Sequence, residues 1–226
     1  MTHTPPLFFP VLFVPYSMTH SLFFLTLFFS DPLFFLTLFF FFSLCNNGQL
    51  GPYEMSGLNP YDVREKCKVK PLCYDFTAPT EWLNLPATRK ALGITSASSQ
   101  WSSCNMQVNS MFKNDWMKSQ QYTIPPLLAN GVRVLIYAGD ADFICNWMGN
   151  KAWTLALDWP HASEFNAAID SDWNVDGTKA GTARTSNGFT FLQVNNAGHM
   201  VPMNQPENSL SMIETFMSGG TFPSGN

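Results

Sequence analysis

Two loops of this sequence carry side chains that can hold and transfer a proton. His199 follows the short apolar segment 189–194, which is rich in β-forming residues and is ended by Asn195, Asn196 and Gly198. Two acids, Asp140 and Asp142, follow a second β-branched segment at 132–138. An imidazole whose Nδ1 hydrogen is bound by a carboxylate has a fixed tautomer, so its Nε2 can accept a proton. The residue types therefore predict general acid–base chemistry.

The elements around these loops must bring the acid and the base together. Strands are predicted at 132–138 and 189–194, and helices at 146–159 and 206–217, so strand and helix alternate as in a layered α/β sheet. A short antiparallel excursion is expected around Asp176-Gly177. In an open α/β sheet, loops at the carboxyl ends of neighbouring strands meet at one edge. The fold class predicted is α/β, with both loops at that edge.

Two interpretations of the acidic loop remain open at this point. An acid after one strand and a histidine after a later one are the last two members of the Ser-Asp-His order in α/β hydrolases. Alternatively, Asp140 and Asp142 form a polar turn that caps the helix predicted from Asn146.

Composition excludes several classes of function. The 226 residues carry a net charge of -4 and no basic run, which argues against nucleic acid as a partner. The five cysteines give no complete disulfide framework, and their spacing matches no zinc pattern. None of the four histidines lies in an H-E-x-x-H motif. We therefore predict no metal site and no cofactor.

The first 50 residues differ in kind from the rest, because their only charged residue is Asp31. An eight-residue Leu/Phe/Thr sequence at 22–29 recurs unchanged at 33–40. Three interpretations compete: a membrane-spanning helix at 22–44, interrupted by Asp31-Pro32; a signal peptide, although it lacks a positive start; and a translated pyrimidine-rich non-coding stretch, which we favour. The domain prediction is a Phe/Leu-rich segment at 1–45, a linker at 46–58, a globular part at 59–220 and a tail at 221–226.

Residues 59–220 resemble the C-terminal portion of the serine carboxypeptidases (peptidase family S10), most closely those of the carboxypeptidase Y type. The resemblance rests on several motifs. They are Asn59-Pro-Tyr-Asp-Val-Arg-Glu-Lys-Cys67, Leu72-Cys-Tyr74, Leu85-Pro-Ala-Thr-Arg-Lys-Ala-Leu-Gly93, Tyr137-Ala-Gly-Asp-Ala-Asp-Phe-Ile-Cys-Asn-Trp147, Gly149-Asn-Lys-Ala-Trp153, Ala197-Gly-His-Met-Val-Pro202 and Gln205-Pro206. The resemblance implies the C-terminal part of an α/β-hydrolase fold with an incomplete sheet, and an enzyme that releases C-terminal amino acids from peptides.

The same resemblance assigns roles residue by residue. Asp142, the second Asp of the Gly-Asp-x-Asp turn, matches the triad acid, and His199 matches the triad base. Asp140 is then expected to hold the turn. Cys145 matches an unpaired thiol near the substrate pocket, and Met200 matches a residue on the leaving-group side. Core packing is the competing interpretation for both, because Cys and Met are commonly buried.

Three other cysteines also match positions of the family. Cys67 and Cys73 match a short-range disulfide, and Cys104 matches a cysteine whose partner lies in the N-terminal half of complete relatives. That disulfide and the family together imply the secretory pathway, with a vacuole-like or extracellular location.

The resemblance breaks at the nucleophile. The family places its serine in a Gly-Glu-Ser-Tyr-Ala-Gly elbow, and no G-x-S-x-G occurs in this sequence. We therefore expect a truncated form that lacks the nucleophilic serine, with doubtful activity alone. The alternative is a catalytically inactive remnant, secreted or membrane-tethered through 22–44. The expected partners are the C-terminus of a peptide substrate and a complementing N-terminal fragment.

Overall fold

The computed structural model describes residues 44, 46–70, 72–95, 100–112, 115 and 118–222. By its internal contacts the chain divides into two units, Met1–Phe41 and Phe42–Asn226, and every described residue belongs to the second. The segment predicted at 22–44 lies outside the described residues except for Leu44. Among the described residues, no helix combines the length and the apolar character needed to cross a bilayer.

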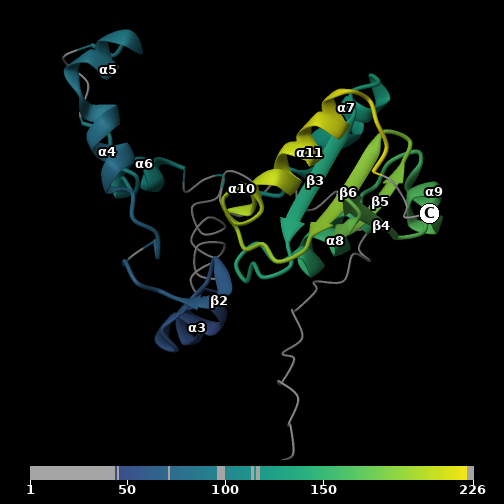
Figure 1. The fold of residues 1–226 in the computed structure, drawn as a ribbon, viewed down its shortest axis with the longest axis horizontal. Coiled ribbons are helices and arrows are strands. Elements are labelled where there is room, and N and C mark those ends of the chain that lie inside the picture. The colour runs from purple at the N-terminus through teal and green to yellow at the C-terminus, as the bar shows by residue number, and fades with distance from the viewer. Residues whose placement is uncertain are drawn as a thin grey trace, which may run out of the picture. The chain divides into compact units, whose positions relative to one another are not determined.

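The described elements run in the following order (Figure 1). They are the π-helix η1 (Asn46–Leu50), α3 (Gly51–Met55), β1 (Leu58–Asn59), β2 (Asp62–Lys66), α4 (Thr77–Asn84), α5 (Pro86–Ala91), α6 (Met106–Met111), the 3₁₀ turn η2 (Gln121–Thr123), α7 (Ile124–Ala129), β3 (Val134–Gly139), α8 (Trp147–Leu155), α9 (Ala162–Ala167), β4 (Ser171–Val175), β5 (Thr178–Ser186), β6 (Phe189–Val194), α10 (Val201–Asn204) and α11 (Pro206–Met217).

Within the described part of the chain, the larger sheet has four strands in the order β3-β6-β5-β4. β3 and β6 pair in parallel from Val134↔Phe189 to Gly139↔Val194, so the loops that follow them leave the same edge of the sheet. β4, β5 and β6 form an antiparallel meander, and β4 and β5 lie in the chain between the two parallel strands (Figure 1). Because parallel strands pair in register here, the two predicted loops emerge side by side.

Both hairpins of the meander turn at residues with positive φ. Asp176 (φ 50°) and Gly177 (φ 76°) join β4 to β5, and Asn187 (φ 48°) and Gly188 (φ 80°) join β5 to β6. Two consecutive residues with positive φ form the two-residue turn whose twist matches that of antiparallel strands, and Asp-Gly and Asn-Gly are the pairs that favour it.

The sheet is covered on both faces, because its strands place alternate side chains on opposite sides. On one face, Leu192 and Val194 of β6 pack with Trp173 and with Met212 of α11. On the other face, Phe189 and Phe191 belong to a second apolar cluster. Its other buried members are Ile124, Leu157, Trp159 and Phe165, and α8 contributes Trp147 and Trp153 at its margin. The predicted mixed α/β layered arrangement is therefore confirmed.

A small antiparallel hairpin, β1 and β2, precedes these layers. The sequence at 61–66 predicts a short helix or turn, and the structure corrects this, because Asp62–Lys66 form the strand β2. The predicted linker at 46–58 holds η1, α3 and the start of β1. A disulfide joins Cys67 to Cys73 directly after the hairpin.

Candidate active site

The acid and the base meet at the edge where β3 and β6 end. His199 Nδ1 lies 2.9 Å from Asp142 Oδ2, across 57 positions of sequence. The side chain of Asp142 is 4% exposed, whereas that of His199 is 39% exposed. A buried carboxylate therefore binds one ring nitrogen of an imidazole that solvent can reach. This arrangement fixes the tautomer and leaves Nε2 as the nitrogen available for proton transfer.

Asp142 is held in place by a second contact on its other oxygen. The main-chain N–H of Cys145 donates to Asp142 Oδ1 over 3.0 Å, so the turn after β3 folds back on its own carboxylate. The pKa of Cys145 is raised, mainly because its sulfur is desolvated and to a smaller extent because of the negative charge of Asp142. The Cys145 thiol is therefore largely protonated at neutral pH, although the residue lies on the exposed side of the site.

Asp140 ties the acid loop to the histidine loop. Its Oδ1 accepts from the N–H of Ala197 over 3.3 Å, and the N–H of Ala141 donates to the carbonyl of Ala197 over 2.8 Å. The two loops approach so closely that a Cβ on Gly139 would lie 2.2 Å from the Ala197 carbonyl oxygen. Only glycine fits there. Asp140 therefore connects the two loops, and this hydrogen bond is separate from the contact between His199 and Asp142.

The β1–β2 hairpin contacts both loops through its main chain, which sequence reasoning missed. The N–H of His199 donates to the Tyr61 carbonyl over 2.7 Å. On the acid side, Val63 N–H donates to the Ala141 carbonyl over 2.9 Å, and Ile144 N–H donates to the Pro60 carbonyl over 3.1 Å. We call residues 60–63 the strap, because they bind the loop of the acid and the loop of the base at once.

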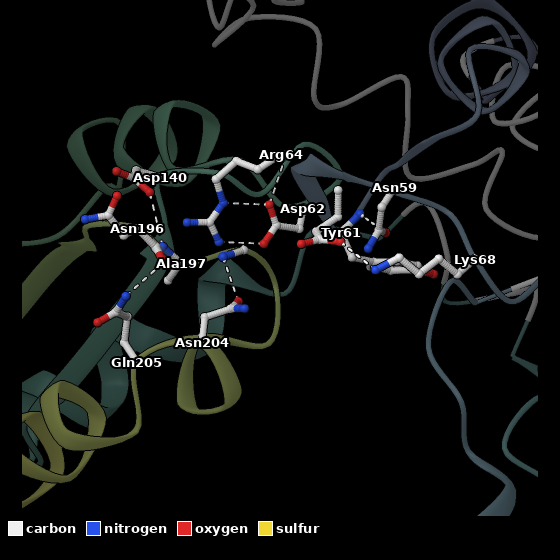
Figure 2. Close-up of polar contacts among 12 residues, drawn as sticks. Asn59, Tyr61, Asp62, Arg64, Lys68, Asp140, Asn196, Ala197, Asn204 and Gln205 are labelled. Carbon is white, nitrogen blue, oxygen red and sulfur yellow. Dashed lines mark hydrogen bonds and ion pairs between the residues drawn. The ribbon is translucent and has the colours of Figure 1, made fainter.

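Side chains of the strap region add further polar contacts, which Figure 2 shows around the histidine loop. Arg64 binds both oxygens of Asp62, at 2.8 and 2.6 Å. The side-chain hydrogen bond from Arg64 lowers the pKa of Asp62, against the opposing effect of desolvation. From the other side, Asn204 Oδ1 accepts from the N–H of Gly198 over 2.9 Å (Figure 2). Asn204 and the Tyr61 carbonyl therefore hold the main chain at Gly198 and His199.

The ring of Tyr61 lies beside the imidazole, with 5.3 Å between the ring centroids. Desolvation raises the pKa of Tyr61, so its phenol is neutral over the whole physiological range. Met200 follows the histidine and is half-buried at the start of α10. The structure thus brings Asp142, Cys145 and His199 together, and Met200 adjoins them through the chain. The motif around Tyr61 was visible in the sequence, but its place in the site depends on long-range main-chain bonds.

Comparison with solved structures supports the α/β architecture. The chain is similar to the crystal structure of Kex1Δp, described as a prohormone-processing carboxypeptidase from Saccharomyces cerevisiae, with a TM-score of 0.60 and 23% identity. The similarity covers 75% of this chain and 38% of that one. At this identity the likeness shows the fold alone.

Sequence comparison identifies the family. The family model described as Serine carboxypeptidase matches residues 42–219. Carboxypeptidase Y of Candida albicans is 46% identical over 178 residues, covering 77% of this chain and 32% of the relative. Carboxypeptidase Y of Komagataella phaffii is also 46% identical, with 34% of its length covered. The chain therefore belongs to the serine carboxypeptidase family, with carboxypeptidase Y-like relatives, and spans about a third of the length of the curated relatives it matches.

Proposed function

We propose that this chain carries the acid–base half of a serine-type carboxypeptidase site, which releases C-terminal amino acids from peptides. The observation that carries the proposal is the 2.9 Å contact between His199 Nδ1 and Asp142 Oδ2 at the carboxyl edge of the parallel strands. In this role Asp142 orients the imidazole and stabilises its protonated form, and His199 acts as the base and then as the acid.

The proposed reaction is acyl transfer through a serine ester. Nε2 of His199 takes the proton of the serine hydroxyl as its oxygen attacks the last peptide carbonyl, and it then gives that proton to the departing amine of the C-terminal residue. Water repeats the two steps on the ester, and the carboxylate product leaves. Cys145 and Met200 are proposed to line the substrate pocket beside the imidazole, since both flank it in the chain or in space.

The nucleophile is proposed to lie outside residues 1–226, in the part of its relatives that this sequence does not cover. This sequence has no Gly-x-Ser-x-Gly elbow, and the match covers about a third of its relatives. Removing a triad serine from a whole enzyme costs a factor of about 10⁶ in kcat, so the acid and base alone are expected to give no measurable hydrolysis. The second candidate function is an inactive remnant of the family. The missing serine elbow favours it as well, and it holds if no added polypeptide restores hydrolysis.

The proposal is tested with the full chain, a blocked dipeptide substrate and a serine-directed fluorophosphonate probe. The chain alone is expected to show neither hydrolysis nor labelling. Added N-terminal polypeptide from a carboxypeptidase Y relative, containing the serine elbow, is expected to restore both. Hydrolysis and labelling by the chain alone would refute the two-part site, and a tight but inactive complex would identify the remnant.

Matched variants assign the roles within the restored complex. His199→Ala is expected to abolish hydrolysis, and Asp142→Asn to lower kcat by about 10⁴ through the wrong imidazole tautomer. His161→Ala is the control. His161 is half-exposed, and among the ion pairs of the described residues it takes part only in the one with Glu164.

We also propose a secretory, vacuole-like or extracellular location, based on the family and on the Cys67–Cys73 disulfide.

A further inference from the structure

The loops that carry the acid and the base also bring a third metal-ligating side chain to the same point. One carboxylate oxygen of Asp142, the sulfur of Cys145 and a ring nitrogen of His199 all lie within 4.8 Å of one another. They supply three donor types, O, S and N, from two loops that the sheet places side by side. Spacing along the chain concealed the group, because His199 follows Asp142 by 57 positions and the three residues match no zinc motif.

We propose that Asp142, Cys145 and His199 form a binding site for Zn²⁺, with water in the fourth position. Zn²⁺ is bound in proteins by thiolate, imidazole and carboxylate, and sites with three protein ligands keep one position open. The contrasting ions Mg²⁺ and Ca²⁺ require oxygen ligands and are excluded by the sulfur and the nitrogen.

The separations fit a tetrahedral ion after small side-chain movements. Bonds of 2.0–2.3 Å place ligand atoms about 3.3–3.7 Å apart around a tetrahedral Zn²⁺. The His199–Asp142 contact, at 2.9 Å, must open slightly, and the sulfur must close from a separation of at most 4.8 Å. His199 and Cys145 are both exposed, so their side chains can rotate towards an entering ion.

The supports behind the ligands are already in place. The N–H of Cys145 bonds to the second oxygen of Asp142, and the N–H of His199 bonds to the Tyr61 carbonyl. The first of these bonds is made to the ligating carboxylate itself, and such outer contacts typically contribute a factor of 10–100 in affinity; the second fixes the main chain that carries the imidazole. Asp142, at 4% exposure of its side chain, forms the floor of the site, and the exposed imidazole marks the open side from which the ion enters.

Binding has a defined proton balance. The thiol of Cys145 must lose its proton to form the Zn–S bond, because the thiolate is the ligand, and that proton passes to the buffer. The carboxylate and the neutral imidazole bind without releasing one. An ion at this site occupies the ring nitrogen or the carboxylate that proton transfer needs, so metal binding and the proposed acid–base role exclude each other.

Titration calorimetry of the full chain with ZnCl₂, in two buffers of different ionisation enthalpy, tests the site without any measurement of hydrolysis. One Zn²⁺ per chain is expected, with about one proton released. MgCl₂ is expected to give no heat of binding. Co²⁺ is the spectroscopic probe, since a thiolate ligand produces a sulfur-to-metal charge-transfer absorption in the near ultraviolet.

The variants separate this site from other donors in the chain. Cys145→Ser and His199→Gln are each expected to weaken Zn²⁺ at least tenfold, and Cys145→Ser also removes the released proton and the cobalt absorption. The matched controls Cys104→Ser and His161→Gln change an exposed thiol and an exposed imidazole elsewhere, and should leave binding unchanged. Circular dichroism of each variant establishes that it is folded.

Three results would overturn the proposal. They are the absence of saturable Zn²⁺ binding to the folded chain, binding that persists unchanged in Cys145→Ser and His199→Gln, and a cobalt–thiolate absorption that disappears with Cys104→Ser instead. The test does not depend on the proposed hydrolytic function, because a chain that never hydrolyses a peptide still binds or fails to bind the ion.

Discussion

Replacement of Gly198 by alanine tests whether the strap holds the histidine loop. A Cβ at position 198 would lie 2.4 Å from the carbonyl oxygen of Tyr61, and 2.9 Å from Cβ of Asp62. Carbon and oxygen atoms in contact normally stay about 3.3–3.6 Å apart, so the overlap is about 1 Å. The obstacle is main chain and cannot be moved by a rotamer change. The strap and the histidine loop must therefore separate.

The expected cost follows from the contacts that the separation disrupts. The His199 N–H to Tyr61 carbonyl bond contributes about 1 kcal/mol, and overpacking adds about 1–3 kcal/mol, so the free energy of unfolding should fall by about 3 kcal/mol. For a unit of this size each kcal/mol lowers Tm by about 2–4 °C, which gives roughly 6–12 °C.

Thermal denaturation followed by circular dichroism measures the loss, and hydrogen exchange of the His199 amide locates it. The control is Gly48→Ala. A Cβ at position 48 would meet no atom within 4 Å, and φ of Gly48 lies outside the positive range that disfavours residues with a side chain. That change should stay within about 0.5 kcal/mol. A Gly198→Ala protein that melts within 2 °C of the wild type, with the His199 amide still protected, would refute the strap.

Two further predictions concern charged groups. Because Arg64 lowers the pKa of Asp62 in the folded chain, this carboxylate stabilises the fold above its unfolded pKa of about 4, and the contribution is lost as pH falls through the folded value. Tm of the wild type should therefore fall more steeply below pH 4 than Tm of Asp62→Asn, and parallel curves would contradict this. Arg184 donates to Asp170 over 2.7 Å and to two main-chain carbonyls of α9, and its side chain is 13% exposed, so Arg184→Ala should cost about 2–4 kcal/mol in urea denaturation. Lys179→Ala, which removes an ion pair of two half-exposed side chains, should cost less than about 1 kcal/mol; equal losses would contradict the burial argument.

The layered sheet could be predicted from sequence because its signals are local. The segments around Val134 and Phe189 are short, apolar and β-branched or aromatic, and Asp176-Gly177 marks a hairpin by itself. Asn187-Gly188 carries the same turn signal and joins β5 to β6. The parallel pairing of β3 with β6 then placed an acid and a base at one edge, as the order of elements predicted.

The strand β2, which begins within the strap, could not be predicted, because nothing local favours it. Residues 62–66 include three further charged residues after Asp62 and only one β-branched residue, Val63, and β2 exposes every position after the first. Its extended backbone is held by hydrogen bonds to Ala141 and to β1. These are tertiary contacts, and such context overrides strand propensity.

The helix α6 was also missed, but the sequence does contain a signal for it. Asn105 is its N-cap, because the side chain accepts from the N–H groups of Gln107 and Val108.

The geometry of the acid and the base is built within this chain, from the sheet edge, the bridge from Asp140 and the strap. None of these supports involves a serine, so the 2.9 Å contact between His199 and Asp142 does not depend on a nucleophile being present. Cys145 lies beside this pair, with its sulfur within 4.8 Å of the ring nitrogen and of the carboxylate oxygen. The same supports place the proposed acid–base pair beside the third proposed zinc ligand, and a zinc titration and a restored hydrolysis assay measure the two proposed uses of this geometry separately.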